Sequence, residues 1–244
     1  MKVSVIGAGA IGSNLARRLS QAGHDVHIAD AQGPERVNTE VTAAGAQPVE
    51  LAAATKDRDV VIVAIPFGVQ PKLKELIATA PPSTVVVDTS NYYPAMNGHI
   101  QAVVDGQVES LWSQEQLGHP IVKAWNAALA ETQRSKGKPA GRPDRIAIPV
   151  AGDSPEARAT VMRLVDDSGF DAFDAGLLAE SWRQQPGTPA YCTELGIEEL
   201  SRALPAAEKD KAPATRDRLW AHFGALAEMP SHEETVATNR AAHH

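Results

Sequence analysis

The sequence predicts an α/β fold with a doubly wound, mostly parallel sheet and a small C-terminal part that combines α/β structure with further helices. Three observations support this prediction. Strand-like runs alternate with amphipathic helical segments along the first half of the chain. Two of the runs, 58–66 and 83–90, have an unbroken Val or Ile stretch at their centre, which is typical of strands covered on both faces by helices. A glycine cluster joins the first strand to the first helix.

The N-terminal half is expected to hold most of the sheet. The helix after the glycine cluster has Ile11, Leu15 and Leu19 on one face, and Gly23 ends it. Its neighbours are short apolar runs bounded by turn residues, as strands of a buried sheet are. The strands expected in this half are 2–6, 24–30, 58–66, 83–90 and 119–125.

The C-terminal half begins after a segment, 131–145, that is rich in Gly, Pro and charge and is expected to be a loop or hinge. A helix is expected from its cap Ser154 to its stop Gly169. The polar residues 230–244 are expected to form a flexible tail. The other expected elements are strands at 146–152 and 170–176 and helices at about 191–204 and 214–228. We therefore divide the chain into an N-terminal domain that holds most of the sheet (1–145), a small second part (146–229) and the tail (230–244).

Composition excludes several classes of function. Lys and Arg number 23 against 30 Asp and Glu, and the net charge of −7 disfavours general binding of nucleic acid. Cys192 is the single cysteine, so no intramolecular disulfide can form, and no Cys/His spacing resembles a metal site. No apolar run approaches the roughly 20 residues that cross a bilayer. We expect a cytoplasmic protein without a metal or a membrane partner.

The glycine cluster matches the pattern G-x-G-x-x-G with Gly7, Gly9 and Gly12. Its context is that of a Rossmann-type nucleotide site: a strand precedes it, a helix follows, and Asp30 closes the next strand 18 positions after Gly12. Gly7 permits the tight turn, Gly9 lets the backbone approach a pyrophosphate, and Gly12 lets helix and strand pack closely. The pattern therefore predicts a dinucleotide at the start of this helix.

The residues after the second strand bear on the choice between NAD and NADP. A carboxylate at Asp30 accepts hydrogen bonds from the ribose hydroxyls and repels a 2′-phosphate, so it favours NAD. Ala31 and Gln32 add no cation. Arg36 lies about one turn further on and is the residue that NADP use would depend on. We favour NAD and keep NADP as the alternative.

The order of segments resembles the F420-dependent NADP oxidoreductase family. The resemblance rests on the glycine motif and covers roughly residues 1–205. The further stretches that carry it are "VVIVAIPF", "VVVDTSNYYP", "IVKAWN" and "VAGDSPEARATVMRLVDDSGFDAFDAG". It implies a Rossmann domain with a small C-terminal part, and hydride transfer between NADP and the deazaflavin F420.

The resemblance also implies positions around the cofactor. Ala10 and Ile11 would lie under the pyrophosphate, and Ile65 and Pro66 would wall the adenosine side. Around the nicotinamide and its partner it implies Asn91 and the stretch Trp125, Asn126, Ala127 and Ala128. One departure bears on the dinucleotide, because NADP-using members place a small hydroxyl residue and an arginine where this chain has Ala31 and Gln32.

We assign no catalytic residue from the sequence. Hydride transfer between two rings asks mainly for positioning and needs no protein acid or base. Lys123 alternates with small apolar neighbours, and we expect it at the surface or a sheet edge. Asn91 and Asn126 each follow a strand, where open α/β sheets bind ligands, and an amide suits the carboxamide of nicotinamide. Turn formation is the alternative role of both asparagines.

Two later segments offer further ligand contacts. A planar acceptor can stack on Trp182 or Tyr191 while Arg183 holds an acid group, although the same stretch can simply connect two helices. The second segment is either a solvated loop or a site that attracts an anionic tail of a cofactor or substrate. Its basic residues are Arg134, Lys136, Lys138, Arg142 and Arg145.

These observations predict an oxidoreductase that transfers hydride between a nicotinamide dinucleotide and a small-molecule redox partner such as F420 or a flavin-like acceptor. One alternative is reduction of a small carbonyl or imine compound, for which Tyr191 and His119 are candidate proton donors. The other is a dinucleotide-binding redox sensor without turnover. A homodimer through the last two expected helices stays open, because Trp220 and Phe223 offer more apolar surface than a terminal helix needs.

Overall fold

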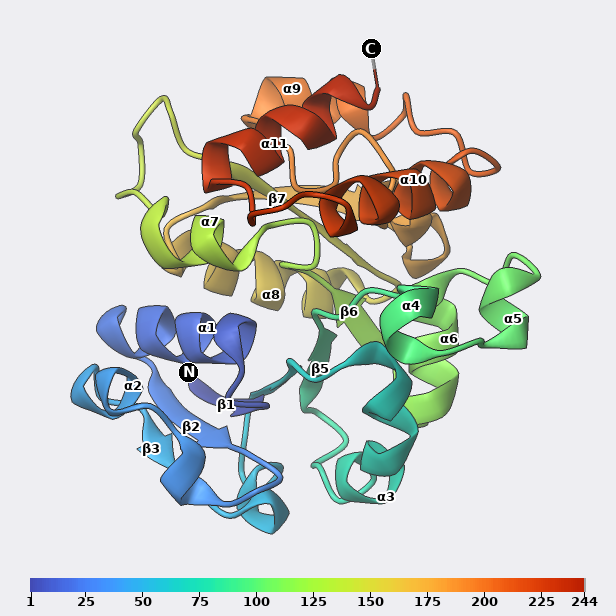
Figure 1. Cartoon of the computed structure of the whole chain (residues 1–244). Helices are drawn as coiled ribbons and strands as arrows, with labels where there is room; N and C mark the ends of the chain where they lie inside the picture. Colours follow the sequence, from blue (N-terminus) through green and yellow to red (C-terminus); the bar gives the residue numbers. More distant parts are fainter. Residues whose placement is uncertain (244) are drawn as a thin grey trace.

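The computed structural model describes residues 1–243, and its centre is an eight-stranded sheet with the order β3-β2-β1-β4-β5-β6-β7-β8 (Figure 1). All neighbouring strands run parallel except β6 and β7, which are antiparallel. The predicted α/β class with a mostly parallel sheet is confirmed. The strands are β1 (Lys2–Ile6), β2 (Asp25–Ala29), β3 (Gln47–Pro48), β4 (Val60–Val63), β5 (Val85–Asp88), β6 (Ile121–Lys123), β7 (Ala147–Gly152) and β8 (Asp171–Gly176).

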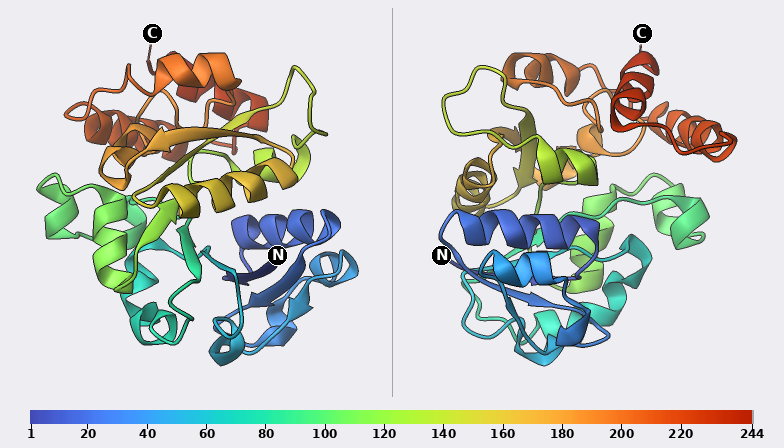
Figure 2. Two further views of the ribbon diagram at one scale, coloured as in Figure 1. Left: turned by 180° about the vertical axis from the view of Figure 1, so that it is seen from behind. Right: turned by 60° about the vertical axis from the view of Figure 1, so that its left-hand side comes forward.

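Helices cover both faces of the sheet (Figures 1 and 2). The α-helices are α1 (Ala10–Gln21), α2 (Thr39–Ala43), α3 (Lys74–Ile77), α4 (Pro94–Asn97), α5 (Gln101–Val104), α6 (Glu109–Leu117), α7 (Ala130–Ser135), α8 (Pro155–Asp167), α9 (Ile197–Ala203), α10 (Ala212–Gly224) and α11 (His232–Ala241). The 3-10 helices are η1 (Pro34–Arg36), η2 (Leu51–Ala53), η3 (Phe67–Leu73) and η4 (Leu178–Gln184). No helix within residues 1–243 is both long and apolar enough to span a bilayer.

Two apolar layers sandwich the sheet because successive strand residues point to opposite faces. In β4, Val60 and Ile62 belong to the layer that α1 and α8 cover, and Val61 and Val63 belong to the other. That second layer also contains Ile77 of α3, Leu117 of α6 and Leu178 of η4. Burial on both faces explains why the central strands read as continuous Val and Ile runs.

Lys123 corrects one expectation from the sequence. It lies in β6, between β5 and β7, and is 0% exposed rather than at the surface or an edge. An ion pair with Asp88 of β5, with 2.7 Å between Nζ and Oδ2, makes this burial tolerable. The expectation failed because the sequence does not show which strands are neighbours. It therefore did not reveal that Asp88, on the adjacent strand β5, would pair with Lys123.

The segment 131–145 is a loop only in its second part. Its first residues belong to α7, which packs beside α1. Arg145, expected in a solvated segment, is 4% exposed and is held by Asp166 and Asp171 at 2.6 and 2.8 Å. These two carboxylates lie far along the chain, so the local composition did not predict the anchor.

The end of the chain also differs from the expected flexible tail. Residues His232–Ala241 form α11, whose start is closed by a capping box between Ser231 and Glu234. Arg240 donates to the carbonyl oxygens of Thr193 and Glu194, which fastens α11 to the loop before α9. Figure 2 shows α10 and α11 at one end of the molecule (red). Polar composition suggested disorder here because the anchoring contacts are long-range.

The predicted division of the chain near residue 145 stays a prediction. β7 and β8, which belong to the predicted second part, extend the same sheet beyond β6. Helix α10 then returns to the segment after β5, where Trp220 packs against Tyr93 with 5.2 Å between ring centroids. This contact brings the last third of the chain to the carboxyl edge of the sheet.

Candidate functional site

The glycine turn between β1 and α1 has the geometry that the predicted roles require. Gly7 has a φ of +109°, and a Cβ on it would lie 2.3 Å from the carbonyl oxygen of Ala64. A Cβ on Gly12 would lie 1.9 Å from the carbonyl oxygen of Gly7, so helix and turn are in direct contact. A Cβ on Gly9, in contrast, would meet nothing within 4 Å. Two glycines are therefore required by packing, and the third keeps an open backbone surface.

The start of α1 is suited to an anion. Gly9 caps the helix without a side-chain hydrogen bond, and its first turn carries no acidic residue. The amides of Ala10 and Ile11 lie in the first turn, whose N–H groups have no partner within a helix. Together with the helix dipole, such free N–H groups attract phosphate.

Asp30 lies beside this turn. One carboxylate oxygen accepts a hydrogen bond from the amide of Ala8 at 3.2 Å, and the other accepts from the amide of Gln32 at 2.9 Å. The carboxylate is therefore fixed between the glycine turn and the residues after β2. Ala31 and Gln32 are exposed, and Arg36 follows at the end of η1.

A cavity of about 770 Å³ opens next to the start of α1. Three arginines from different elements meet there: Arg17 of α1, Arg36 of η1 and Arg134 of α7. Of the basic residues for which attraction of an anionic tail was the alternative to a solvated loop, Arg134 reaches this cavity, whereas Lys136 pairs with Glu233. The remaining lining residues are Ala8, Gly9, Ala10, Ser13, Asn14, Asn38, Glu40, Val41, Ala130, Glu131 and Ser135.

Asn91 and Asn126 meet at the carboxyl ends of β5 and β6. Asn91 donates to the carbonyl oxygen of Asn126 at 3.0 Å, and the Asn126 amide donates to Oδ1 of Asn91 at 3.0 Å. Asn126 also exchanges two hydrogen bonds with Gln184, both at 2.8 Å. Asn126 is 2% exposed, so its side chain joins β6 to the end of η4, and Asn91 is the more accessible of the pair.

The other residues that the resemblance implies around the cofactor, on its adenosine and nicotinamide sides, differ in setting. Ile65 is half-buried and Pro66 exposed, directly after β4. The carbonyl oxygen of Ala127 accepts a hydrogen bond from the amide of Cys192. Trp125 is fully buried in the core below α8, where its indole nitrogen is 3.4 Å from the Ser168 hydroxyl. Its side chain therefore faces away from the sheet edge.

A buried polar network underlies the same edge, and the sequence analysis missed it. Lys123 donates to Asp88 and to the carbonyl oxygen of Ser90. The second oxygen of Asp88 accepts from the amide and the hydroxyl of Ser90 and from Gln70, at 2.9, 2.7 and 2.7 Å. The network fixes the backbone immediately before Asn91. The sequence offered one signal for this network, because Asp88 and Lys123 each follow an apolar run that was expected to be a strand.

Four further titratable groups lie near this edge: Glu109 and Cys192 are buried, and Tyr93 and Tyr191 are half-buried. Burial raises the pKa of the Glu109 carboxyl, which accepts a hydrogen bond from the amide of Tyr92 at 2.9 Å. The hydroxyl of Tyr93 donates to that of Tyr191 at 3.1 Å, and burial raises the pKa of Tyr191 well above its ordinary value. Burial also raises the pKa of the Cys192 thiol to about 12, so the thiol stays protonated at neutral pH.

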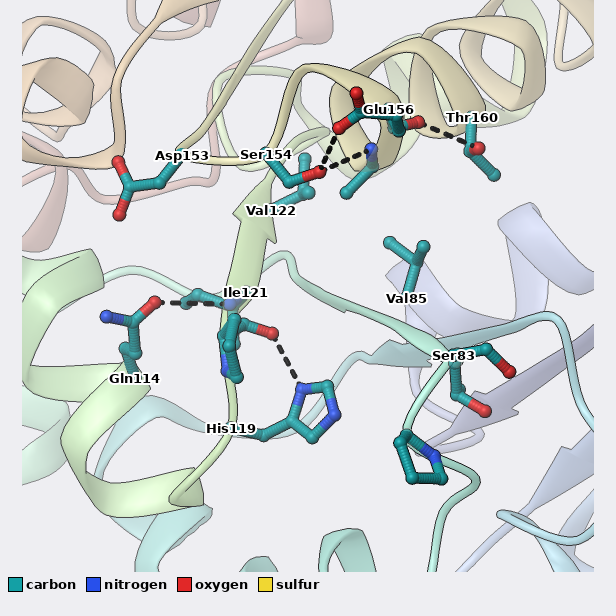
Figure 3. Close-up of a pocket in the computed structure, with 14 residues that line it drawn as sticks. Ser83, Val85, Gln114, His119, Ile121, Val122, Asp153, Ser154, Glu156 and Thr160 are labelled. Atoms are coloured by element: carbon teal, nitrogen blue, oxygen red, sulfur yellow. Dashed lines mark hydrogen bonds between the residues drawn. The ribbon is translucent and has the colours of Figure 1, made fainter.

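His119 lies elsewhere. It lines a cavity of about 380 Å³ at the amino ends of β5 and β6, with Ser154 and Glu156 at the start of α8 on the opposite wall (Figure 3). Its Nδ1 is 2.7 Å from the carbonyl oxygen of Pro120. Because the glycine turn and Asn91 are at the carboxyl edge of the sheet, His119 is not a proton donor for that site.

The remaining candidates of the second part are engaged with each other. Arg183 lies over the Trp182 ring at 4.3 Å and pairs with Glu180 at 3.0 Å. Trp182 lines a separate cavity with Glu109, whereas Tyr191 faces Tyr93. Within residues 1–243, no group of three or more His, Cys, Asp or Glu side chains is placed to hold a metal ion.

Comparison with known proteins gives one family match. Residues 2–92 match the family described as NADP oxidoreductase, coenzyme F420-dependent. The Escherichia coli (strain K12) protein YjhV is 46% identical over 102 residues, which is 42% of this chain and 74% of that protein.

Two solved structures extend the similarity over most of the chain. A hypothetical protein, SMa0349 from Sinorhizobium meliloti, is 28% identical with a TM-score of 0.68, and the match covers 80% of this chain and 95% of that one. A protein described as a "putative f420 dependent nadp-reductase" from Arthrobacter sp. FB24 is 19% identical with a TM-score of 0.58, over 93% and 94% of the two chains. The second likeness shows the fold alone.

Proposed function

This chain belongs to the family of F420-dependent NADP oxidoreductases, and from that premise we propose that it transfers a hydride between a nicotinamide dinucleotide and a planar redox partner such as coenzyme F420. The chain is an NAD(P)-dependent oxidoreductase. When bound, the nicotinamide and deazaflavin rings supply the hydride chemistry, and the protein supplies position and exclusion of water.

The observation that carries the proposal is the open backbone at Gly9, at the start of a helix with unpartnered amides. A Cβ at this position would meet nothing within 4 Å in the free protein, although the glycines on either side are closely packed. That gap suits a pyrophosphate lying against the backbone, with the amides of Ala10 and Ile11 as donors. The chain's own residues therefore fit a dinucleotide.

The rest of the cofactor would extend to both sides of the turn. Asp30 would accept the ribose hydroxyls, since its two hydrogen bonds to backbone amides leave lone pairs on both oxygens. Ile65 and Pro66 would face the adenosine side. Asn91 would orient the nicotinamide carboxamide, because Asn126 and the buried Lys123 network hold it at the edge of the sheet.

We propose NAD(H) as the preferred dinucleotide. The Asp30 carboxylate would repel a 2′-phosphate, and its bonds to Ala8 and Gln32 restrain it from turning away. Arg36 favours the alternative, because it shares a cavity with Arg17 and Arg134 and makes no ion pair within residues 1–243. A 2′-phosphate reaching that cavity would gain charge-assisted hydrogen bonds.

Binding titrations separate the two dinucleotides. We expect NADH to bind the wild type more tightly than NADPH, and Asp30→Ala to reverse that order by weakening NADH and improving NADPH. Arg36→Ala should leave NADH binding within about twofold, since this is a change at an exposed side chain. Tighter binding of NADPH by the wild type, lost in Arg36→Ala, would instead assign the chain to NADP.

Reduction of a small imine or carbonyl compound is a second candidate, and the Tyr93 and Tyr191 hydroxyl pair favours it. The pair lies just beyond Asn91, and a tyrosine hydroxyl is protonated at neutral pH and can act as a donor. A carbonyl or imine reductase needs such a donor, whereas transfer between two rings does not. Tyr191→Phe would abolish the reductase but leave hydride transfer to a deazaflavin within a few-fold.

A further inference from the structure

A second cavity, of about 330 Å³, lies between the turn that joins α5 to α6, the end of η4 and the first turns of α10. Figure 1 shows these elements on the side of the molecule away from α1 and α2, with α10 above α4 and α6. The cavity shares no lining residue with the one beside the glycine turn. Its apolar wall consists of Val103, Val104, Val108, Trp182, Pro186 and Pro213.

Arg216 of α10 lines this cavity with donors to spare. The residue is 8% exposed, and its guanidinium lies over the Tyr92 ring at 5.5 Å. Its Nε donates to Asp217 at 2.8 Å. The two terminal nitrogens make no hydrogen bond within residues 1–243. A guanidinium held in this way presents a planar pair of donors, which matches a carboxylate.

Glu109, in the first turn of α6, supplies the opposite charge on the same cavity. The residue is 1% exposed, and one carboxylate oxygen accepts from the amide of Tyr92. Among residues 1–243 no ion pair joins Glu109 to Arg216, although both line one cavity. Glu109 also accepts a hydrogen bond from Gln185, and Arg216 pairs with Asp217 at 2.8 Å. The cavity therefore has an acidic acceptor on one side and guanidinium donors on the other.

We propose that this cavity binds a free α-amino acid with an apolar side chain. Its carboxylate would pair with the terminal nitrogens of Arg216, and its ammonium group would pair with Glu109. The side chain would lie against the valines, the prolines and Trp182. A ligand with an anion and a cation a few atoms apart complements the donors of Arg216 and the acceptor of Glu109 together, so a zwitterion is favoured over a simple carboxylate or amine.

The cavity adjoins the candidate redox site through Tyr92. Glu109 holds the Tyr92 amide and Arg216 covers the Tyr92 ring, and Asn91 is the preceding residue. The inference goes beyond the proposed function and does not rest on it, because the ligand, its contacts and its test involve no dinucleotide.

Calorimetric titration of the full chain tests the assignment. L-leucine is the probe, N-acetyl-L-leucine lacks the ammonium charge, and L-leucinamide lacks the carboxylate. We expect L-leucine to bind with a Kd of about 1 mM or below, and each blocked compound to bind at least about tenfold more weakly. No binding of L-leucine up to about 10 mM, or equal binding of all three compounds, overturns the proposal.

Variants assign the two charges separately. Arg216→Met keeps the length of the side chain and should weaken L-leucine at least about tenfold, while L-leucinamide loses little. Glu109→Gln should remove the preference for L-leucine over N-acetyl-L-leucine. Arg218→Met, two residues on in α10 and outside this cavity, is the matched control and should bind as the wild type does.

Circular dichroism first establishes that each variant is folded. If Arg216→Met does not fold, Arg216→Lys replaces it, since a lysine keeps the charge and loses the planar pair of donors. Unchanged affinity for L-leucine in a folded Arg216 variant contradicts the proposed site. The wild-type ligand series needs no variant, and a failure of the hydride-transfer proposal leaves all of these results unaffected.

Discussion

Gly7, Gly9 and Gly12 share one motif but differ in what a side chain would meet at each. At Gly7 and Gly12 a Cβ would lie within 2.3 Å of a carbonyl oxygen, whereas at Gly9 it would lie in open space. The backbone of Gly9 has φ −71°, a conformation that every residue adopts. Neither packing nor backbone strain explains a glycine at this position, and the approach of a ligand does.

Gly9→Ala is therefore expected to separate binding from folding. Its free energy of unfolding should fall by no more than about 1 kcal/mol, the cost of alanine at a helix N-cap, while dinucleotide binding weakens at least about tenfold, because the methyl group occupies the pyrophosphate position. Urea denaturation and fluorescence titration with NADH measure the two quantities. Gly224→Ala, also in open space, is the control that should leave NADH binding unchanged. Unaltered NADH binding by Gly9→Ala would remove the main support for the site.

Lys123 and Asp88 form the buried ion pair beneath the candidate site, and both side chains are 0% exposed. Lys123→Met should lower the free energy of unfolding by about 3–5 kcal/mol, since it leaves the Asp88 charge buried without its partner. Adding Asp88→Asn should restore part of the loss, because a neutral amide needs no counter-ion. Urea denaturation measures both changes. Lys72→Met, at an exposed lysine, should cost less than about 0.5 kcal/mol. A loss in Lys123→Met as small as this control would show that the pair contributes little.

Side chains in the site divide into those that local pattern predicts and those that it does not. Gly7, Gly9, Gly12 and Asp30 belong to one short motif, and their placement follows from two adjacent strands and the turn and helix that join them. The burial of Lys123 depends on an Asp 35 positions away, on another strand. A charge that is stable only through a distant partner has no local signature.

At the scale of elements, apolar runs and helix caps gave correct positions. β4 and β5 lie inside the two Val-rich runs, and α8 begins after Ser154, which accepts a hydrogen bond from the Ala157 amide as its N-cap. α7 and α11 were missed because few of their residues are apolar and their supports are distant. Arg240 of α11 bonds to the loop before α9, which no periodicity in the sequence reveals.

Helix α11 supplies the prediction at this scale. Ser231→Ala removes the side-chain acceptor for the Glu234 amide and should cost about 1 kcal/mol, which is about a fivefold rise in amide exchange within α11. Hydrogen exchange followed by mass spectrometry measures it, with peptides from α9 as the internal control. Fast exchange across α11 already in the wild type would show that these residues behave as the flexible tail expected from composition.

At the scale of the whole molecule, the parallel strands β1, β4, β5 and β6 direct the glycine turn, Ile65 and Asn91 to one edge of the sheet. Open α/β sheets bind ligands at such an edge. Strand β7 runs antiparallel to β6. The chain after β8 nevertheless reaches the same edge, where the end of η4 bonds to Asn126 and α10 packs on Tyr93. The predicted homodimer stays a prediction, although Trp220, which suggested it, is 41% exposed and packs on Tyr93 within the chain.

The most direct test of the central claim is to mix the protein, without oxygen, with oxidised F420 and either NADH or NADPH, and to follow the absorbance of the deazaflavin. The account predicts loss of absorbance with the wild type, faster with NADH, and little loss with Gly9→Ala at the same dinucleotide concentration. No loss with either dinucleotide, in a protein that binds NADH, would contradict hydride transfer to F420 and leave the reduction of an imine or carbonyl compound as the activity to test.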